Sequence, residues 1–131
     1  QQNDAHVVSD NTGFGTRAAD VLIREDGDPL EAIIDYYFEE KPAATRQMGT
    51  QVERMERLLD LVKQYKADGV VASRLYMCDL WAFEHFLMRK RLHENNVPFL
   101  ELEVDYTPEG QGQIKTRVQA FVESLADRQT A

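Results

Sequence analysis

The 131-residue sequence contains only one cysteine, Cys78. One cysteine cannot form a disulfide within the chain, so we expect the protein in a reducing, cytoplasmic environment. One thiol also cannot hold a zinc ion or an iron–sulfur cluster by itself, because such sites usually take three or four protein ligands. Any metal site that uses Cys78 therefore needs further ligands from elsewhere.

Positive charge and long apolar runs are scarce as well. The chain has 15 Lys and Arg against 23 Asp and Glu, which gives a formal net charge of −8. An acidic surface repels nucleic acids and anionic membranes, so we expect neither as a partner. No apolar run approaches the roughly 20 residues of a membrane span, and no signal-peptide pattern is visible. The ordinary apolar content of 43% indicates a globular domain.

Several segments have the apolar spacing of helices. Pro29 is expected in the first turn of a helix that Asp28 caps. Thr50 and Glu53 have the spacing of a capping box at the start of another helix. The expected helices cover residues 16–24, a segment from residue 29, residues 50–66, residues 79–95, and a last segment that includes residues 114–125.

Three segments are expected to be strands, over residues 5–10, 69–77 and 99–105. The β-branched start of the second is typical of a buried central strand. In the third, Glu101 and Glu103 alternate with leucines, which indicates one wet face. Helices between successive strands imply a parallel sheet with right-handed crossovers. We therefore predict an α/β fold, a three-layer Rossmann- or flavodoxin-like domain with a small parallel sheet flanked by helices.

Ligands of open parallel sheets bind beyond the carboxyl ends of the strands. Three loops are expected at that edge, over residues 10–17, 76–79 and 105–117. Cys78 belongs to the second loop and begins a helix, where the positive helix end favours the thiolate that nucleophiles and metal ligands require. The alternative is that Cys78 is a small, packed residue at a strand end.

The histidines do not offer a base for a nucleophilic thiol. His85 and His93 lie on the helix that follows Cys78, and His6 begins a strand at the opposite edge of the sheet. All three are expected at the surface. Because a cysteine nucleophile needs a nearby base, we exclude chemistry of the cysteine-protease type.

The sequence "TGFGTR" suggests a second kind of site. Gly13 and Gly15, followed by Thr16 and Arg17 at a helix amino-terminus, could cradle an anion. The alternative is a tight turn that simply requires glycine. Further candidates for polar contacts, at the start of the last helix, are Gln113 and Arg117.

Together these motifs carry a family resemblance. In order they are "VVSDNTGFGTR", "EDGDPLEA", "YKADGVV", "YMCD", "VPFLELEVDY" and "GQIKTRVQAFVE". The set resembles the carboxyl-terminal part of a subunit of the 2-hydroxyacyl-CoA dehydratase / benzoyl-CoA reductase family. The resemblance implies that residues 1–131 form a single α/β domain, the carboxyl-terminal part of a larger subunit with two Rossmann-like domains around a 4Fe-4S cluster. It also implies that Cys78 is one of three protein ligands, the others belonging to the preceding domain.

The resemblance further implies an enzyme that reduces an acyl-CoA thioester by one electron. The outcome is either 2-hydroxyacyl-CoA dehydration or ring reduction of the benzoyl-CoA type. The implied partners are the acyl-CoA substrate, a homologous second subunit in a heterodimer, and an ATP-dependent iron–sulfur activator protein. This chain alone is expected to be inactive, with part of the acyl-CoA pocket at Gly13, Gly15, Thr16, Arg17, Gln113 and Arg117. The alternative is a metal-free, flavodoxin-like binding or interaction module.

Overall fold

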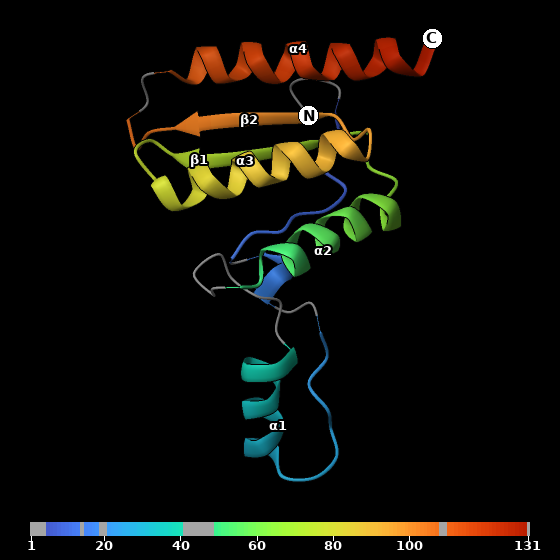
Figure 1. The fold of residues 1–131 in the computed structure, drawn as a ribbon, viewed down its shortest axis with the longest axis vertical. Helices are drawn as coiled ribbons and strands as arrows, with labels where there is room; N and C mark the ends of the chain where they lie inside the picture. Colours follow the sequence, from blue (N-terminus) through green and yellow to red (C-terminus); the bar gives the residue numbers. More distant parts are fainter. Residues whose placement is uncertain (1–4, 14, 19–20, 41–48, 108–109, 131) are drawn as a thin grey trace.

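The computed structural model of the chain describes residues 5–13, 15–18, 21–40, 49–107 and 110–130 (Figure 1). Helices and strands alternate in its second half, as the sequence predicts. In chain order the elements are η1 (Thr16–Ala18), α1 (Pro29–Asp35), η2 (Tyr36–Glu40), α2 (Gln51–Gln64), β1 (Val70–Leu75), α3 (Asp79–Glu94), β2 (Phe99–Val104) and α4 (Gln111–Thr130).

The described sheet consists of β1 and β2, which run parallel. Val70 pairs with Phe99 and Leu75 pairs with Val104, so the strands are in register along their whole length. Parallel neighbours need a crossover connection, and α3 provides it. The sequence therefore predicted both the direction of the strands and the helix between them.

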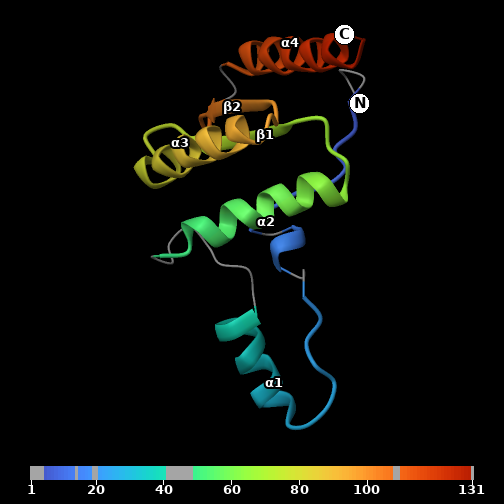
Figure 2. The same cartoon turned by 45° about the vertical axis from the view of Figure 1, so that its right-hand side comes forward.

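The elements stack in layers, which Figures 1 and 2 show from two sides. Helix α3 packs against both strands on one face of the sheet, and α4 packs against β2 on the other face. Helix α2 lies on the outer side of α3, while α1 lies away from the sheet in both views. The chain has the predicted α/β architecture, with a small parallel sheet between helical layers.

Two predicted helix caps have different outcomes. The Asp28 carboxylate accepts hydrogen bonds from the backbone N–H of Leu30 at 2.7 Å and of Glu31 at 3.3 Å, which confirms the cap of α1. The capping box of α2 was wrong, because the Thr50 side chain makes no cap hydrogen bond. Its hydroxyl instead accepts a hydrogen bond from the Arg54 guanidinium, one turn along the helix.

The amino-terminal predictions were mostly wrong. Residues 5–10 do not pair as a strand, and the side chain of Val7 is 90% exposed. Of the helix predicted over residues 16–24, the described residues form only the single turn η1, and residues 19–20 lie outside the described part. The local sequence favours an extended segment, but a strand also requires a neighbour that supplies hydrogen bonds. No described strand takes that place beside residues 5–10.

Strand β1 is also less buried than its sequence predicts. It pairs with β2 on one edge, and its side chains alternate between half-buried and exposed. Val71 and Leu75 point to the face that carries α4, but α4 packs on β2, so Val71 stays 49% exposed. The apolar composition of β1 therefore exceeds what the described elements cover.

None of the described helices combines the length and the apolar character that crossing a lipid bilayer requires.

Candidate functional site

The carboxyl edge of the sheet places Cys78 where the sequence predicts it. After β1 ends, the Tyr76 N–H donates to the Val104 carbonyl at 2.9 Å, which continues the pairing with β2 for one residue. Met77 then adopts a positive φ of 62°, and the Cys78 N–H donates back to the Leu75 carbonyl at 3.2 Å. This tight turn ends the strand and directs the chain into α3.

Cys78 is the N-cap residue of α3. Its backbone is extended, with φ −88° and ψ 90°, and its carbonyl accepts the first helical hydrogen bond from the Ala82 N–H at 2.9 Å. The side chain makes no capping hydrogen bond, and the free thiol is half-buried. The sulfur is therefore neither sealed in the core nor engaged as a cap, and both features suit a ligand or a reactive group.

In the loop of residues 10–17, the Asp10 carboxylate accepts hydrogen bonds from the residues that follow it. Asp10 Oδ1 accepts from the Thr12 N–H at 3.1 Å, the Thr12 hydroxyl at 2.8 Å and the Thr16 N–H at 3.2 Å. The bonds from Thr12, ahead of those from Thr16, hold the pKa of the Asp10 carboxyl below its ordinary value. A Cβ at Gly15 would overlap this carboxylate, so a larger residue there would have to displace the Asp10 side chain from these hydrogen bonds. The predicted anion cradle is occupied by the chain's own Asp10.

The third predicted loop contains Asp105, Gln113 and Arg117. The Tyr106 N–H donates to the Asp105 carboxylate at 2.6 Å, and Gln113 is exposed in the first turn of α4. The Arg117 guanidinium donates to the backbone carbonyl of Glu101 at 2.7 Å, which ties α4 to β2. Residues 108–109 of this loop lie outside the described part of the chain.

The three loops do not all meet. The Tyr76–Val104 hydrogen bond brings the second and third loops to the same edge of the sheet. Within the described ranges, the hydrogen bonds of the Asp10 loop stay inside that loop, and Figures 1 and 2 show η1 beside α2 instead of beside the start of α3. Because residues 5–10 do not join the sheet, they do not carry the loop that contains Gly13, Gly15, Thr16 and Arg17 to its carboxyl edge.

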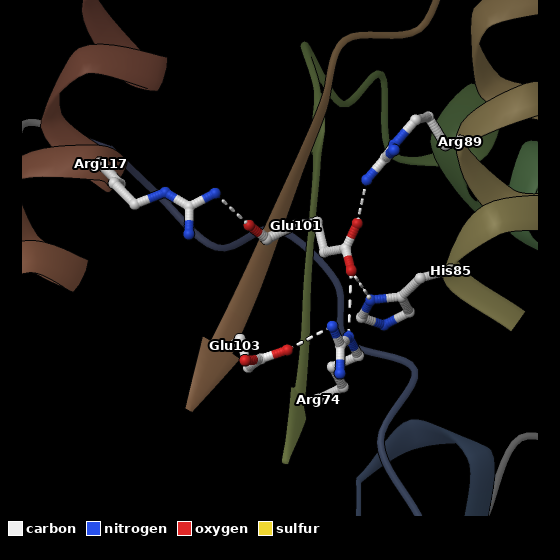
Figure 3. Close-up of polar contacts among 6 residues, drawn as sticks. All are labelled: Arg74, His85, Arg89, Glu101, Glu103 and Arg117. Carbon is white, nitrogen blue, oxygen red and sulfur yellow. Dashed lines mark hydrogen bonds and ion pairs between the residues drawn. The ribbon is translucent and has the colours of Figure 1, made fainter. Parts of the chain in front are cut away.

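A charged network that the sequence did not indicate lies between α3 and the sheet (Figure 3). Its centre is Glu101 of β2, whose carboxylate accepts a hydrogen bond from Arg74 Nε of β1 at 3.1 Å. The same carboxylate pairs with Arg89 of α3 and lies 3.4 Å from Nδ1 of His85. Arg74 also pairs with Glu103, which lies two residues further along β2 toward the carboxyl edge. One carboxylate thus joins both strands to α3.

His85 was predicted at the surface, and that prediction was wrong. Its side chain is 1% exposed, and it packs edge-on against Trp81 and Phe99. His93, by contrast, is exposed as predicted, and so is His6. The signal that could have found His85 is its spacing from Trp81, Met88 and Leu92, which are all at least half-buried on the sheet side of α3.

The residues around Glu101 change the pKa of its carboxyl group. Burial by itself raises the pKa of a carboxyl group, but the hydrogen bond from Arg74, the contact with His85 and the charge of Arg89 outweigh it. The pKa of Glu101 is held below its ordinary value. Glu101 is therefore an ionised anchor for the surrounding cations and has no reason to act as a proton donor near neutral pH.

The described residues contain no group of three or more His, Cys, Asp or Glu side chains that could hold a metal ion. Cys78 is the chain's one thiol. A 4Fe-4S cluster at this edge would need its other ligands from outside the described residues, and the role of Cys78 as one ligand stays a prediction.

In structural terms the chain is an α/β protein with a small parallel sheet and a free thiol at the start of the crossover helix. Residues 1–125 match the family model described as "2-hydroxyglutaryl-CoA dehydratase, D-component". The chain belongs to this family, as the sequence motifs predicted.

Two curated relatives match almost the whole chain, and a third matches about half of it. A protein of Escherichia coli (strain K12) named as the dehydratase subunit YjiM is 29% identical over 126 residues, which are 95% of this chain and 32% of that protein. The (R)-phenyllactyl-CoA dehydratase beta subunit of Clostridium sporogenes is 24% identical over 129 residues, 95% of this chain and 33% of its own length. The beta subunit of (R)-2-hydroxyglutaryl-CoA dehydratase from Acidaminococcus fermentans is 32% identical over 72 residues, 55% of this chain and 19% of its own. The chain thus spans about a third of the length of the first two relatives.

Proposed function

We propose that this chain is part of a 2-hydroxyacyl-CoA dehydratase subunit, in which Cys78 supplies one thiolate ligand of a 4Fe-4S cluster. The main support is the position of the thiol, at the carboxyl edge of a parallel sheet and at a helix amino-terminus, in a chain that matches the dehydratase family. Thiolates are the usual ligands of such clusters, and the positive helix end offsets their charge. When bound, the cluster supplies one-electron transfer to the acyl-CoA thioester.

The rest of the edge has the character of an acyl-group contact surface. Tyr76, Met77 and Tyr106 are 62%, 77% and 87% exposed and lie at the ends of β1 and β2. Large apolar side chains at such an edge can pack against an acyl chain and exclude water from the thioester. We assign part of the acyl-group pocket to these residues.

The contacts to the coenzyme A part stay a hypothesis. Gln113 is exposed and free to reach a polar ligand. Arg117 is engaged with the Glu101 carbonyl and would have to exchange that hydrogen bond for a phosphate. Of the loop that contains Gly13, Gly15, Thr16 and Arg17, the backbone amides of Thr12 and Thr16 are taken by Asp10. We therefore favour Gln113 over the Asp10 loop, which also lies away from the carboxyl edge of the sheet.

Among the two reactions that the sequence left open, dehydration has the stronger support. The similar proteins are named as dehydratase subunits acting on phenyllactyl-CoA and 2-hydroxyglutaryl-CoA. In such a reaction the hydroxyl group on C2 and a hydrogen from C3 leave as water, and an enoyl-CoA remains. We propose a homologous second subunit and an ATP-dependent iron–sulfur activator protein as partners. The name "beta subunit" of the relatives supports the first of these.

Anaerobic reconstitution with iron and sulfide tests the ligand. The experiment compares the full-length subunit with its Cys78→Ser and Met77→Asn variants by iron content and cluster absorption. Met77→Asn is the matched control because it is exposed in the same turn, and asparagine tolerates the positive φ of 62°. We expect Cys78→Ser to lose the cluster absorption and Met77→Asn to retain it.

Equal cluster content in the wild type and Cys78→Ser would remove Cys78 from the ligand set. A complete absence of iron from the wild type would favour the metal-free binding module instead.

A further inference from the structure

The N-cap Cys78 and three residues of α3 lie along one stripe of the helix. Cys78, Ala82, His85 and Arg89 are spaced by four, three and four residues, which keeps them on one face at 3.6 residues per turn. His85 and Arg89 both contact Glu101. At a rise of 1.5 Å per residue, Cys78 lies about 10 Å further along the helix from His85, toward the carboxyl edge. Two residues of the stripe that begins at the thiol thus contact the same carboxylate of β2.

Glu101 connects more elements than its neighbours do. Its carboxylate binds Arg74 of β1 and contacts α3, and its backbone carbonyl accepts from Arg117 of α4. In the described ranges of the chain, every polar side-chain contact between α3 and the sheet goes to Glu101 (Figure 3). Glu103 is more exposed, and among the described residues its ion pair is with Arg74. The position of α3 on the sheet therefore depends on Glu101 more than on any other polar group described.

We propose that Glu101 is a positioning residue for Cys78. By fixing His85 and Arg89 it sets where the amino-terminus of α3 lies on the sheet, and so where the thiol lies at the carboxyl edge. The importance of this role for catalysis rests on the proposed function, in which Cys78 is a cluster ligand. The positioning itself is a property of the polypeptide and can be measured without iron.

The opposite face of α3 provides a matched control. Glu84 is 5% exposed and makes a bidentate ion pair with Arg54 of α2, with both nitrogen–oxygen distances at 2.8 Å. Glu84→Gln therefore removes a buried carboxylate from the same helix without touching the stripe that holds Cys78. Arg89→Gln removes the exposed partner of Glu101, since the Arg89 side chain is 62% exposed, and should fold even where Glu101→Gln does not.

The experiment measures the rate at which iodoacetamide alkylates Cys78 in the iron-free chain, by mass spectrometry of its peptide. We expect alkylation to be about threefold faster, or more, in Glu101→Gln and Arg89→Gln at unchanged far-UV circular dichroism, because the half-buried thiol is no longer held in place. The alkylation rates of Glu84→Gln and the wild type are compared at urea concentrations at which the two proteins have the same unfolding free energy. Under these conditions the two rates should be equal.

Two results would overturn the proposal. One is a wild-type alkylation rate in folded Arg89→Gln and Glu101→Gln. The other is an equal acceleration in Glu84→Gln, which would show general loosening of α3. Since no iron is present, neither result depends on whether Cys78 is a cluster ligand, and a failed reconstitution leaves this measurement unaffected.

Discussion

Arg54 of α2 and Glu84 of α3 form a bidentate ion pair inside the helical layer, with Nε and Nη2 each 2.8 Å from a carboxylate oxygen. The side chains are 9% and 5% exposed. Burying two charges is costly, but parallel hydrogen bonds between a guanidinium and a carboxylate offset the cost. The pair holds α2 against α3, so that α2 forms a further layer on the side of α3 that faces away from the sheet.

Removing the carboxylate of this pair should destabilise the chain strongly. Glu84→Gln breaks the buried ion pair by removing the charge of one partner, which typically costs about 3–5 kcal/mol. Urea unfolding followed by circular dichroism measures the change. Glu123→Gln, an exposed position on α4, serves as the control and should change the unfolding free energy by less than about 0.5 kcal/mol. Similar small changes in both variants would contradict the structural role of the pair.

The stability of the chain should depend on Glu101 at low pH. Because the folded-state pKa of Glu101 is lowered, the unfolded state binds more protons as the pH falls. The stabilisation from its ion pairs is therefore present above the ordinary carboxyl value of 4.5 and is lost as the pH falls through the lower folded-state pKa. Urea midpoints of wild type and Glu101→Gln should differ at pH 7 and converge toward pH 3. A constant difference across this range would show that the charge of Glu101 is not involved.

The Asp28 cap should control the local stability of α1. Asp28→Ala removes the acceptor for the N–H groups of Leu30 and Glu31, which costs about 1 kcal/mol, or about fivefold in local opening. Amide hydrogen exchange over residues 32–36 measures this effect. Asp28→Asn retains a capping oxygen and should exchange nearly as slowly as the wild type. Equal exchange in all three forms would mean that the cap does not limit the opening of α1.

Two glycine-to-alanine substitutions should have different effects, one on the proteolysis of the Asp10 loop and one on the unfolding free energy. In Gly15→Ala the new Cβ overlaps the Asp10 carboxylate, so the hydrogen bonds from Thr12 and Thr16 must rearrange and proteolysis within residues 10–17 should accelerate. In Gly112→Ala the Cβ meets open space in α4, and helix propensity should raise the unfolding free energy by up to about 1 kcal/mol. Limited proteolysis and urea unfolding measure the two effects. Unchanged proteolysis in Gly15→Ala would show that the Asp10 turn is not rigid.

Local patterns were enough to place most of the regular structure in the second half of the chain. The predicted strand over residues 69–77 corresponds to β1, and that over residues 99–105 corresponds to β2. Helices α2 and α3 also lie within one or two residues of their predicted bounds. Strand β2 and helix α2 carry their own periodicity, since apolar residues recur every second residue or every third and fourth, and β1 has a β-branched start.

The same reasoning failed where a partner decides the structure. The apolar residues Val7 and Val8 predicted a strand, but residues 5–10 have no described neighbour to pair with. His85 was assigned to the surface from its position along the helix alone. Its burial depends on Trp81, on Phe99 and on Glu101 of a strand 16 residues further along the chain.

By itself the sequence determined the family, the parallel α/β architecture and the position of Cys78 at the start of a helix after a strand. Each of these follows from residues that are neighbours along the chain, whose spacing fixes which side of an element they occupy. Only the tertiary structure decided that Glu101 gathers Arg74, His85 and Arg89, and that Asp10 fills its own loop. Such contacts depend on how close separate elements approach one another, and side-chain periodicity does not encode that distance.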